Sequence, residues 1–334
     1  MAPRVSVLLP CRDAAAHLPQ AILSLEAQTF RDFEVLACDD GSSDDTPTQL
    51  EDWARRDPRV RPIAARGRGL IPALSTLLAA ARGEIVARMD ADDIAAPDRL
   101  AEQVELLERE HLAVCGARVR YFPVHEVGAG ARRYEAWVNA ALEHDAIVRE
   151  LFVECPIPHP TLAARRSALL AVGGYRDMGW PEDYDLVLRL WAAGYRFGRC
   201  ARVLLHWREG SHRTSRVDAR YEAGAFRRCK IAFLRRTLLE MRNGAVVWGA
   251  GPLGKRFARE LVRQGIGLRA FVDLDPRRIG QSIYDAPVVA PPGIDELRDA
   301  LVCGAVGQAG ARADIRAELD RRGFIEMEDY VMVA

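Results

Sequence analysis

Paired cysteines are absent from this sequence of 334 residues. Its seven cysteines are scattered, odd in number and never arranged as CxxC. Disulfide frameworks and cysteine-based zinc sites need paired or closely spaced cysteines, so the pattern argues against both. We therefore expect a reducing compartment and a cytoplasmic location.

Net charge and long hydrophobic runs are missing as well. The 47 basic residues balance 47 acidic ones, so no overall field draws the protein to nucleic acid or to an anionic membrane. No apolar segment approaches the length that spans a bilayer, and residues 1–10 lack the apolar core and cleavage site of a signal peptide. We expect a soluble protein without a transmembrane segment and without a nucleic-acid partner.

Hydrophobic residues, by contrast, are plentiful. They make up 49% of the chain, which excludes a disordered protein, and the length suggests roughly two domains. Short aliphatic runs that are typical of buried strands alternate with segments of helical spacing. The predicted strands are 5–9, 33–39, 60–65 and 84–89, and the predicted helices are 14–28, 44–57 and 70–82. This alternation predicts a parallel sheet covered on both faces, with ligands beyond the carboxyl ends of its strands.

Carboxylates gather where one predicted strand ends. The stretch "MDADD" (89–93) places Asp90, Asp92 and Asp93 directly after "GEIVAR". One explanation is a solvated acidic turn before the next helix, since Asp is a good N-cap. The other is a site for Mg²⁺ or Mn²⁺, because hard cations prefer oxygen ligands. Without a cation, three clustered carboxylates would repel one another and raise one another's pKa.

Three segments in this order and spacing resemble the family 2 glycosyltransferases: "VSVLLPCRD", "DDGSSDDT" and "ARGEIVARMDADDIAAPDRL". The resemblance covers about residues 4–215. It implies a GT-A-type nucleotide-diphospho-sugar transferase domain. It also implies an inverting, metal-dependent enzyme that moves a sugar from a nucleoside diphosphate donor, a UDP-sugar, to a hydroxyl of a glycan or lipid-linked acceptor in polysaccharide synthesis.

The same resemblance implies roles for the donor side. Asp40 would accept a hydrogen bond from the nucleotide base, as a carboxylate can from the ring N–H of uracil. Pro10 and Arg12 would line that pocket, with Asp39 beside it. For "DDGSSDDT" a turn followed by a helix cap at Ser43 or Asp44 remains a second explanation, and both can hold.

For the acidic cluster, the resemblance implies that Asp90 faces the ribose and Asp92 the metal. Asp93 would support or share the metal role. Arg66, Arg68 and Arg88 could grip phosphate, although surface solvation is the favoured interpretation of Arg66 and Arg68. Family members often carry an Arg–Asn pair in the following helix, where this sequence has "PALS" (72–75).

The acceptor side is predicted from "PEDYDLVLRL" (181–190) and "PIPHPT" (156–161). Pro181 marks a helix start, and the resemblance implies that Asp183 is the catalytic base, with Glu182 beside it. Acidic residues there could instead complement the helix dipole. By the same resemblance His159 lines the acceptor side, and a structural histidine bonded to a backbone carbonyl is the open alternative.

The segment 204–216, "LLHWREGSHRTSR", resembles the part of the family that closes over the diphosphate. The candidates for this contact are His206, Arg208, His212 and Arg213. Of these, His212 could also complete the metal shell.

After residue 216 the composition changes. Residues 217–243 are basic and amphipathic and predict a connecting helix, and residues 244–334 begin a second strand–loop–helix–strand unit. The glycine pattern Gly249-x-Gly251-x-x-Gly254 and the acid Asp273 at the end of the second strand are typical of a small Rossmann-like α/β domain. Such a loop admits a pyrophosphate, so a nucleotide or NAD-like ligand is expected, and an empty loop is the alternative.

The expected organisation is therefore a glycosyltransferase domain (1–216), a connecting helix (217–243) and a Rossmann-like domain (244–334). A second hypothesis is that the chain is a nucleotide-binding sensor or an oxidoreductase whose activity lies in the C-terminal domain. The N-terminal half would then bind a sugar nucleotide without catalysing a reaction. The pairing of "DADD" with "PED" disfavours it.

Overall fold

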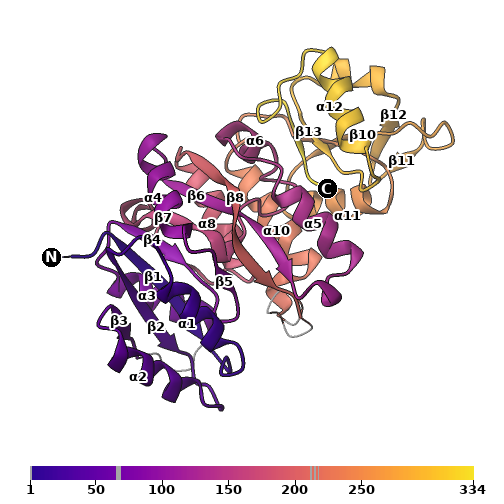
Figure 1. Cartoon of the computed structure of the whole chain (residues 1–334). Coiled ribbons are helices and arrows are strands. Elements are labelled where there is room, and N and C mark those ends of the chain that lie inside the picture. Colours follow the sequence, from indigo (N-terminus) through magenta and orange to yellow (C-terminus); the bar gives the residue numbers. More distant parts are fainter. Residues whose placement is uncertain (1, 65–68, 211–212, 214–215, 217) are drawn as a thin grey trace. The chain divides into compact units, whose positions relative to one another are not determined.

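The computed structural model describes residues 2–64, 69–210, 213, 216 and 218–334 (Figure 1). The chain forms two compact units, and each is described by itself. The N-terminal unit comprises Met1–Ile147, Pro156–Met178 and Glu182–Val217, and the C-terminal unit comprises Val148–Cys155, Gly179–Pro181 and Asp218–Ala334.

The N-terminal unit is built on an eight-stranded sheet of order β3-β2-β1-β4-β7-β6-β8-β5. Its strands are β1 (Val5–Cys11), β2 (Phe33–Asp39), β3 (Val60–Pro62), β4 (Ile85–Arg88), β5 (Ile94–Ala95), β6 (Val114–Phe122), β7 (Ala163–Arg165) and β8 (Phe197–Arg208). Strands β1 to β4 pair in parallel, as predicted. The prediction is wrong for the sheet as a whole, because β7 runs antiparallel to β4 and β6, and β5 antiparallel to β8.

Helices flank this sheet, and Figure 1 shows α1, α2 and α3 beside the first strands. The helices are α1 (Leu18–Glu26), α2 (Thr46–Arg56), α3 (Leu70–Ala80), α4 (Arg99–Arg109), α5 (Ala129–Val138), α6 (His144–Arg149), α7 (Arg166–Ala171) and α8 (Glu182–Ala192), with 3-10 turns η1 (Val124–Glu126) and η2 (His159–Thr161). The helix α1 is shorter than the predicted range 14–28, since Pro19 fixes its first turn. All seven residues of β1 are buried, as expected for a central parallel strand.

The C-terminal unit has a six-stranded sheet of order β11-β12-β10-β9-β13-β14. Its strands are β9 (Ala245–Trp248), β10 (Leu268–Val272), β11 (Ser282–Ile283), β12 (Ala286–Val289), β13 (Leu301–Gly304) and β14 (Tyr330–Met332). Its helices are α10 (Ala223–Arg235), α11 (Pro252–Arg263) and α12 (Ala311–Arg321), with turns η3 (Ala219–Tyr221) and η4 (Pro291–Glu296). Among the ladders of this unit's described residues, only β11 and β12 pair antiparallel. The second unit is thus the small α/β domain that the sequence predicted.

The segment expected to be one long connecting helix is helical over a shorter range. The helix α10 ends at Arg235, because the N–H groups of Thr237 and Leu239 both bond to the carbonyl of Leu234 and close the ladder. The residues that follow form turns up to the start of β9.

Candidate active site

The acidic cluster lies at the carboxyl end of β4, the position predicted for a ligand site. One carboxylate oxygen from each of Asp90, Asp92 and Asp93 lies within 4.8 Å of the others. Asp93 is fully buried, and the other two are half-buried. Three carboxylates this close favour protonation unless a positive charge compensates them.

Asp93 shows most clearly what the cluster lacks. Its Oδ1 accepts a hydrogen bond from the backbone N–H of Arg208 at 2.8 Å, and its buried Oδ2 has no hydrogen-bond partner within the described part of the chain. Burial, followed by the neighbouring charges of Asp90 and Asp92, raises the pKa of Asp93 well above its usual range. Burial and Asp90 also raise the pKa of Asp92 to about 6. A buried oxygen without a donor, in an all-oxygen cluster, fits a hard divalent cation.

Arg88 supplies a strong positive charge beside the cluster. It is the last residue of β4, only 3% exposed, and forms an ion pair with Asp90. Burial lowers its pKa, but Asp90 outweighs that effect and the pKa is raised overall. The sequence offered a signal for this pair, because an arginine interrupts the apolar run "EIVARM", yet its partner could not be identified from the sequence.

Arg208, one of the candidates for the diphosphate, ends β8 next to the cluster. Its Nε donates to the carbonyl of Asp92 at 2.8 Å and its Nη2 to Oε1 of Gln20 at 2.5 Å. Its guanidinium also lies 4.4 Å from the centre of the Phe122 ring. These contacts orient the side chain at the cluster.

The other candidates of that segment lie differently. Arg213 is paired with Glu209 at 3.1 Å and stacks over Trp207, whereas His206 is exposed on β8. His212, Arg66 and Arg68 lie outside the described residues.

The residues predicted for the base pocket lie where β1 and β2 end side by side, with Cys11 opposite Asp39. Asp40 is 4% exposed, and its Oδ1 accepts from the N–H of Gly69 at 3.2 Å. The guanidinium of Arg12 lies 4.0 Å from the other oxygen. Pro10 is buried in β1.

Asp39 faces its own loop, where its carboxylate accepts from the N–H groups of Gly41 and Ser42 at 3.2–3.4 Å. Asp44 accepts from the N–H of Thr46 at 3.0 Å at the start of α2. The loop therefore has the turn bonding that the sequence also allowed, but the N-cap of α2 is Asp45, whose side chain makes no cap bond, and not Ser43 or Asp44. Asp40 lies beside Arg12.

The acceptor-side residues gather at the start of α8. Glu182 is completely buried, whereas Asp183 is half-buried and accepts from the N–H of Tyr184 at 2.7 Å. The Nε2 of His159 lies 3.0 Å from the hydroxyl of Tyr175, and its Nδ1 lies 3.7 Å from Glu182. Burial, with the charge of Arg88, lowers the pKa of His159 well below its usual range, so the ring is neutral near pH 7.

Tyr175 lies where the two halves of the site meet. Its pKa is raised, first by burial and then by the carboxylates of Glu182, Asp183 and Asp90, while Arg88 opposes them. Carboxylates of the acidic cluster and of the helix that carries Asp183 thus both affect the pKa of the Tyr175 hydroxyl. Asp90 and Asp183, more than ninety positions apart in the sequence, therefore both act on the same buried hydroxyl.

The loop before α8 is fixed by Arg189. Its Nη1 and Nη2 donate to the carbonyls of Val172 and Gly174 at 2.5 and 2.7 Å, and its Nε pairs with Asp185 at 2.7 Å. Gly173 and Gly174 have φ values of +83° and +60°, so this loop uses glycine for its backbone conformation.

The glycine loop of the C-terminal unit lies between β9 and α11, as predicted. Gly249 has a φ of +117°, and a Cβ on Gly254 would lie 1.7 Å from the carbonyl oxygen of Gly249. A Cβ on Gly251 would meet open space. The first and third glycines are therefore required by the fold of the loop, and the second leaves room beside it.

Asp273 is already engaged at the end of β10. Its carboxylate accepts from the N–H of Ala250 at 2.8 Å, from that of Asp275 at 2.9 Å and from Arg278 at 2.9 Å. Burial raises the pKa of this group, but the three donors outweigh it and the pKa is lowered. In this structure Asp273 holds the glycine loop.

Known proteins resemble this chain over its N-terminal part. The family described as "Glycosyl transferase family 2" matches residues 6–173. An uncharacterized glycosyltransferase of Haemophilus influenzae is 30% identical over 227 residues, which cover 64% of this chain and 68% of that protein. The putative glycosyltransferase EpsE of Bacillus subtilis is 30% identical over 225 residues, covering 66% and 78%.

Two solved structures share the fold. S. aureus TarS 1-349 in complex with UDP-GlcNAc aligns with a TM-score of 0.55 at 16% identity, over 70% of this chain and 66% of that one. The mannosyltransferase PcManGT from Pyrobaculum calidifontis, in complex with GDP-Man and Mn²⁺, aligns with a TM-score of 0.52 at 23% identity, over 70% and 62%.

The family match and the fold together define a nucleotide-sugar glycosyltransferase of the GT-A type. More particularly, the chain belongs to glycosyl transferase family 2. No helix among the described residues is both long enough and apolar enough to cross a membrane.

Proposed function

We propose that residues 1–216 form an inverting, metal-dependent glycosyltransferase that uses a UDP-sugar donor and a glycan or lipid-linked hydroxyl acceptor. The observation that supports it best is the all-oxygen cluster with the unbonded Oδ2 of Asp93, electrostatically linked through Tyr175 to Asp183. The complexes of TarS with UDP-GlcNAc and of PcManGT with GDP-Man and Mn²⁺ support a nucleotide-sugar donor.

Asp92 and Asp93 are the proposed ligands of Mg²⁺ or Mn²⁺, and Asp90, paired with Arg88, faces the ribose. When bound, the cation neutralises charge on the leaving diphosphate. Arg208 adds positive charge beside the cluster, and His212 is proposed from the sequence as a further contact of the diphosphate or the metal. Asp40 accepts from the ring N–H of the base, between Pro10 and Arg12, with Asp39 holding the loop.

Asp183 is the proposed base. It takes the proton of the acceptor hydroxyl while that oxygen attacks the anomeric carbon from the face opposite the diphosphate, whose bond to the sugar breaks in the same step. Glu182 is not the proposed proton acceptor, because it is completely buried; its proposed role is to orient His159 at the acceptor side.

The test is Asp183→Asn, which keeps the shape of the side chain but accepts no proton at neutral pH. Transfer is expected to fall by about two to four orders of magnitude, with donor affinity nearly unchanged. Asp145→Asn is the matched control, since Asp145 is an exposed acid in the first turn of α6. Near-normal transfer by a folded Asp183→Asn enzyme refutes the assignment.

For residues 244–334 we propose a nucleotide or NAD-like ligand at the glycine loop of Gly249, Gly251 and Gly254. The open space beside Gly251 supports a bound ligand at this loop. Asp273 was expected to bond the ribose of that ligand, and it can do so only if Arg278 moves away from its carboxylate. Gly251→Val should then abolish stabilisation of the chain by NAD⁺ or UDP-sugar at this loop. If neither compound stabilises a chain whose donor site carries Asp92→Ala, the loop is structural.

A further inference from the structure

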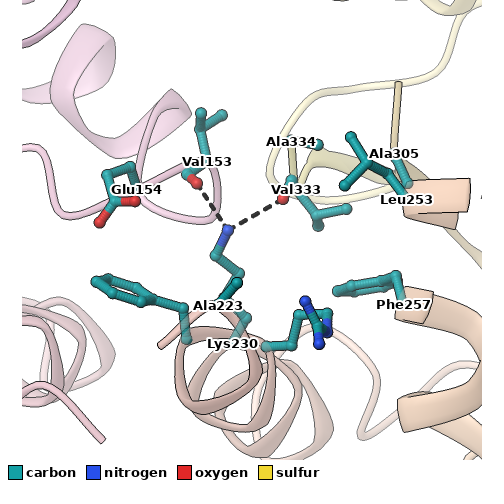
Figure 2. A pocket seen from close by; sticks show the side chains of 11 residues that line it. Val153, Glu154, Ala223, Lys230, Leu253, Phe257, Ala305, Val333 and Ala334 are labelled. Carbon is teal, nitrogen blue, oxygen red and sulfur yellow. Dashed lines mark hydrogen bonds between the residues drawn. The ribbon is translucent and has the colours of Figure 1, made fainter. Parts of the chain in front are cut away.

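A pocket of about 200 Å³ lies within the C-terminal unit (Figure 2). Its walls come from α10, the first turns of α11, the residues that directly follow β13 and β14, and residues 153–154. The lining residues are Val153, Glu154, Ala223, Phe226, Arg227, Lys230, Leu253, Phe257, Ala305, Val333 and Ala334. Nothing in the proposed transfer reaction uses them.

The pocket lies at a position where open α/β sheets bind ligands. The strand β9 has β10 on one side and β13 on the other, so the strand order reverses there. Leu253 lies in the first turn of α11, which follows β9, and Ala305 directly follows β13. Crevices beyond the carboxyl ends of strands at such a reversal are the usual ligand sites of these sheets.

Lys230 places a positive charge in the pocket. It is 7% exposed, and its Nζ donates to the carbonyls of Val153 at 2.7 Å and Val333 at 3.0 Å (Figure 2). An ammonium has three N–H donors, so one remains. Burial, with smaller contributions from the guanidinium groups of Arg227 and Arg312, lowers the pKa of Lys230 to about 8, and the charge of Glu154 opposes this shift. Among the lining residues, the two basic side chains of Arg227 and Lys230 outnumber the one carboxylate, Glu154.

Arg227 adds a second donor group, one turn away on α10. It is half-buried, and no hydrogen bond or ion pair to its guanidinium is found within the described ranges. The remaining wall is mostly apolar, with the side chains of Phe226, Phe257 and Leu253. An unpaired guanidinium next to apolar walls suits a ligand that carries an anionic group on an apolar body.

Size limits the ligand further. Pockets for drug-sized molecules measure about 300–1,000 Å³. At about 200 Å³ this pocket is smaller, so a whole dinucleotide does not fit inside it.

We propose that this pocket binds a small organic anion, with its carboxylate or phosphate on Arg227 and the remaining N–H of Lys230, and its apolar body against Phe226, Phe257 and Leu253. The site is separate from the residues proposed for transfer and makes the C-terminal unit a sensor of such a compound.

The experiment is calorimetry on the full chain with three probes of similar size. Phenyl phosphate and benzoate carry the two candidate anions, and benzyl alcohol is the neutral analogue. At least one anion should bind about tenfold or more tightly than benzyl alcohol. Which anion binds decides between phosphate and carboxylate.

Two pairs of variants assign the binding to this pocket. Arg227→Ala should weaken it about tenfold, whereas Arg228→Ala, on an exposed neighbour outside the pocket, should not. Ala223→Phe fills the mouth at the start of α10 and should also weaken binding. Its control, Ala313→Phe, places the same side chain on an exposed position of α12 and should leave binding unchanged.

The sequence has only two lysines, Lys230 and Lys255, so ¹⁵Nζ labelling gives two lysine signals. The ligand should shift the signal lost in Lys230→Met and leave the other in place. The proposal is overturned if neither anion binds better than benzyl alcohol, or if Arg227→Ala and Arg228→Ala bind equally. Glycosyl transfer measured on the same variants keeps this outcome separate from the fate of the proposed transferase.

Discussion

Two buried carboxylates at opposite ends of the N-terminal sheet have opposite surroundings. Glu34, near the start of β2, is 2% exposed and accepts from Ser6, Arg61 and Arg82. Asp93, beyond the end of β4, is 0% exposed and has one oxygen without a donor in the described structure. The protein supplies hydrogen-bond partners to both oxygens of Glu34, so we call that end of the sheet the complete end. One oxygen of Asp93 has no such partner in the described structure, so we call that end the incomplete end.

The pKa values follow this difference. Burial raises the pKa of Glu34, but Arg82, Arg61 and Ser6 outweigh it and lower the value to about 2. At the other end, burial and neighbouring acids raise the pKa of Asp92 to about 6. Burial alone therefore does not distinguish the two acids; the missing hydrogen-bond partner of Asp93 does.

The largest effect is expected at the incomplete end. Asp92→Ala removes a proposed cation ligand, and transfer should fall by about three orders of magnitude, since a bound cation stabilises the transition state by several kcal/mol. Excess EDTA should have the same effect on the wild type, and added Mn²⁺ should reverse it. Full turnover in EDTA, measured by release of the nucleoside diphosphate, contradicts the role.

At the complete end, the effect should be on stability alone. Glu34→Gln leaves buried donors with a poorer acceptor and should lower the free energy of unfolding by about 1–3 kcal/mol, measured by urea denaturation. Glu105→Gln is the control, because its pair with Arg109 is exposed and should contribute little. Loss of cation binding in folded Glu34→Gln would show that the two ends are not independent.

The nucleotide base should give a smaller effect. If Asp40 accepts from a ring N–H, UDP should bind about tenfold more tightly than CDP, whose ring presents an acceptor there. Calorimetry with Mn²⁺ present measures both. Asp40→Asn should reduce the difference, and equal affinities in the wild type would remove Asp40 from base recognition.

The smallest effect is the pH dependence of Glu34. Because its pKa is lower in the folded than in the unfolded protein, its contribution is complete above about 4.5 and is lost as the pH falls toward about 2. The unfolding free energy of the wild type should therefore fall more steeply than that of Glu34→Gln over this window. Parallel curves in thermal melts contradict the pairing.

The sequence predicted the features that depend on neighbours in the chain. The clustering of Asp90, Asp92 and Asp93 is local, and so are the start of α8 at Glu182 and the glycine loop after β9. Each follows from residues a few positions apart, where spacing alone determines geometry.

What the sequence did not predict depends on distant contacts. The ion pair of Arg88, the hydrogen bond between His159 and Tyr175 and the donors that engage Asp273 all arise when separate elements pack. The antiparallel β7 was missed for the same reason, since strand direction is set by pairing and not by composition.

Calorimetric titration with Mn²⁺ in the presence of UDP measures directly whether the acidic cluster binds the cation. The proteins to compare are the wild type, Asp93→Asn and Glu34→Gln. The account predicts one site in the wild type, an affinity at least about tenfold weaker in Asp93→Asn, and wild-type affinity in Glu34→Gln. Equal Mn²⁺ affinity in wild type and folded Asp93→Asn, or no binding to the wild type at all, contradicts it.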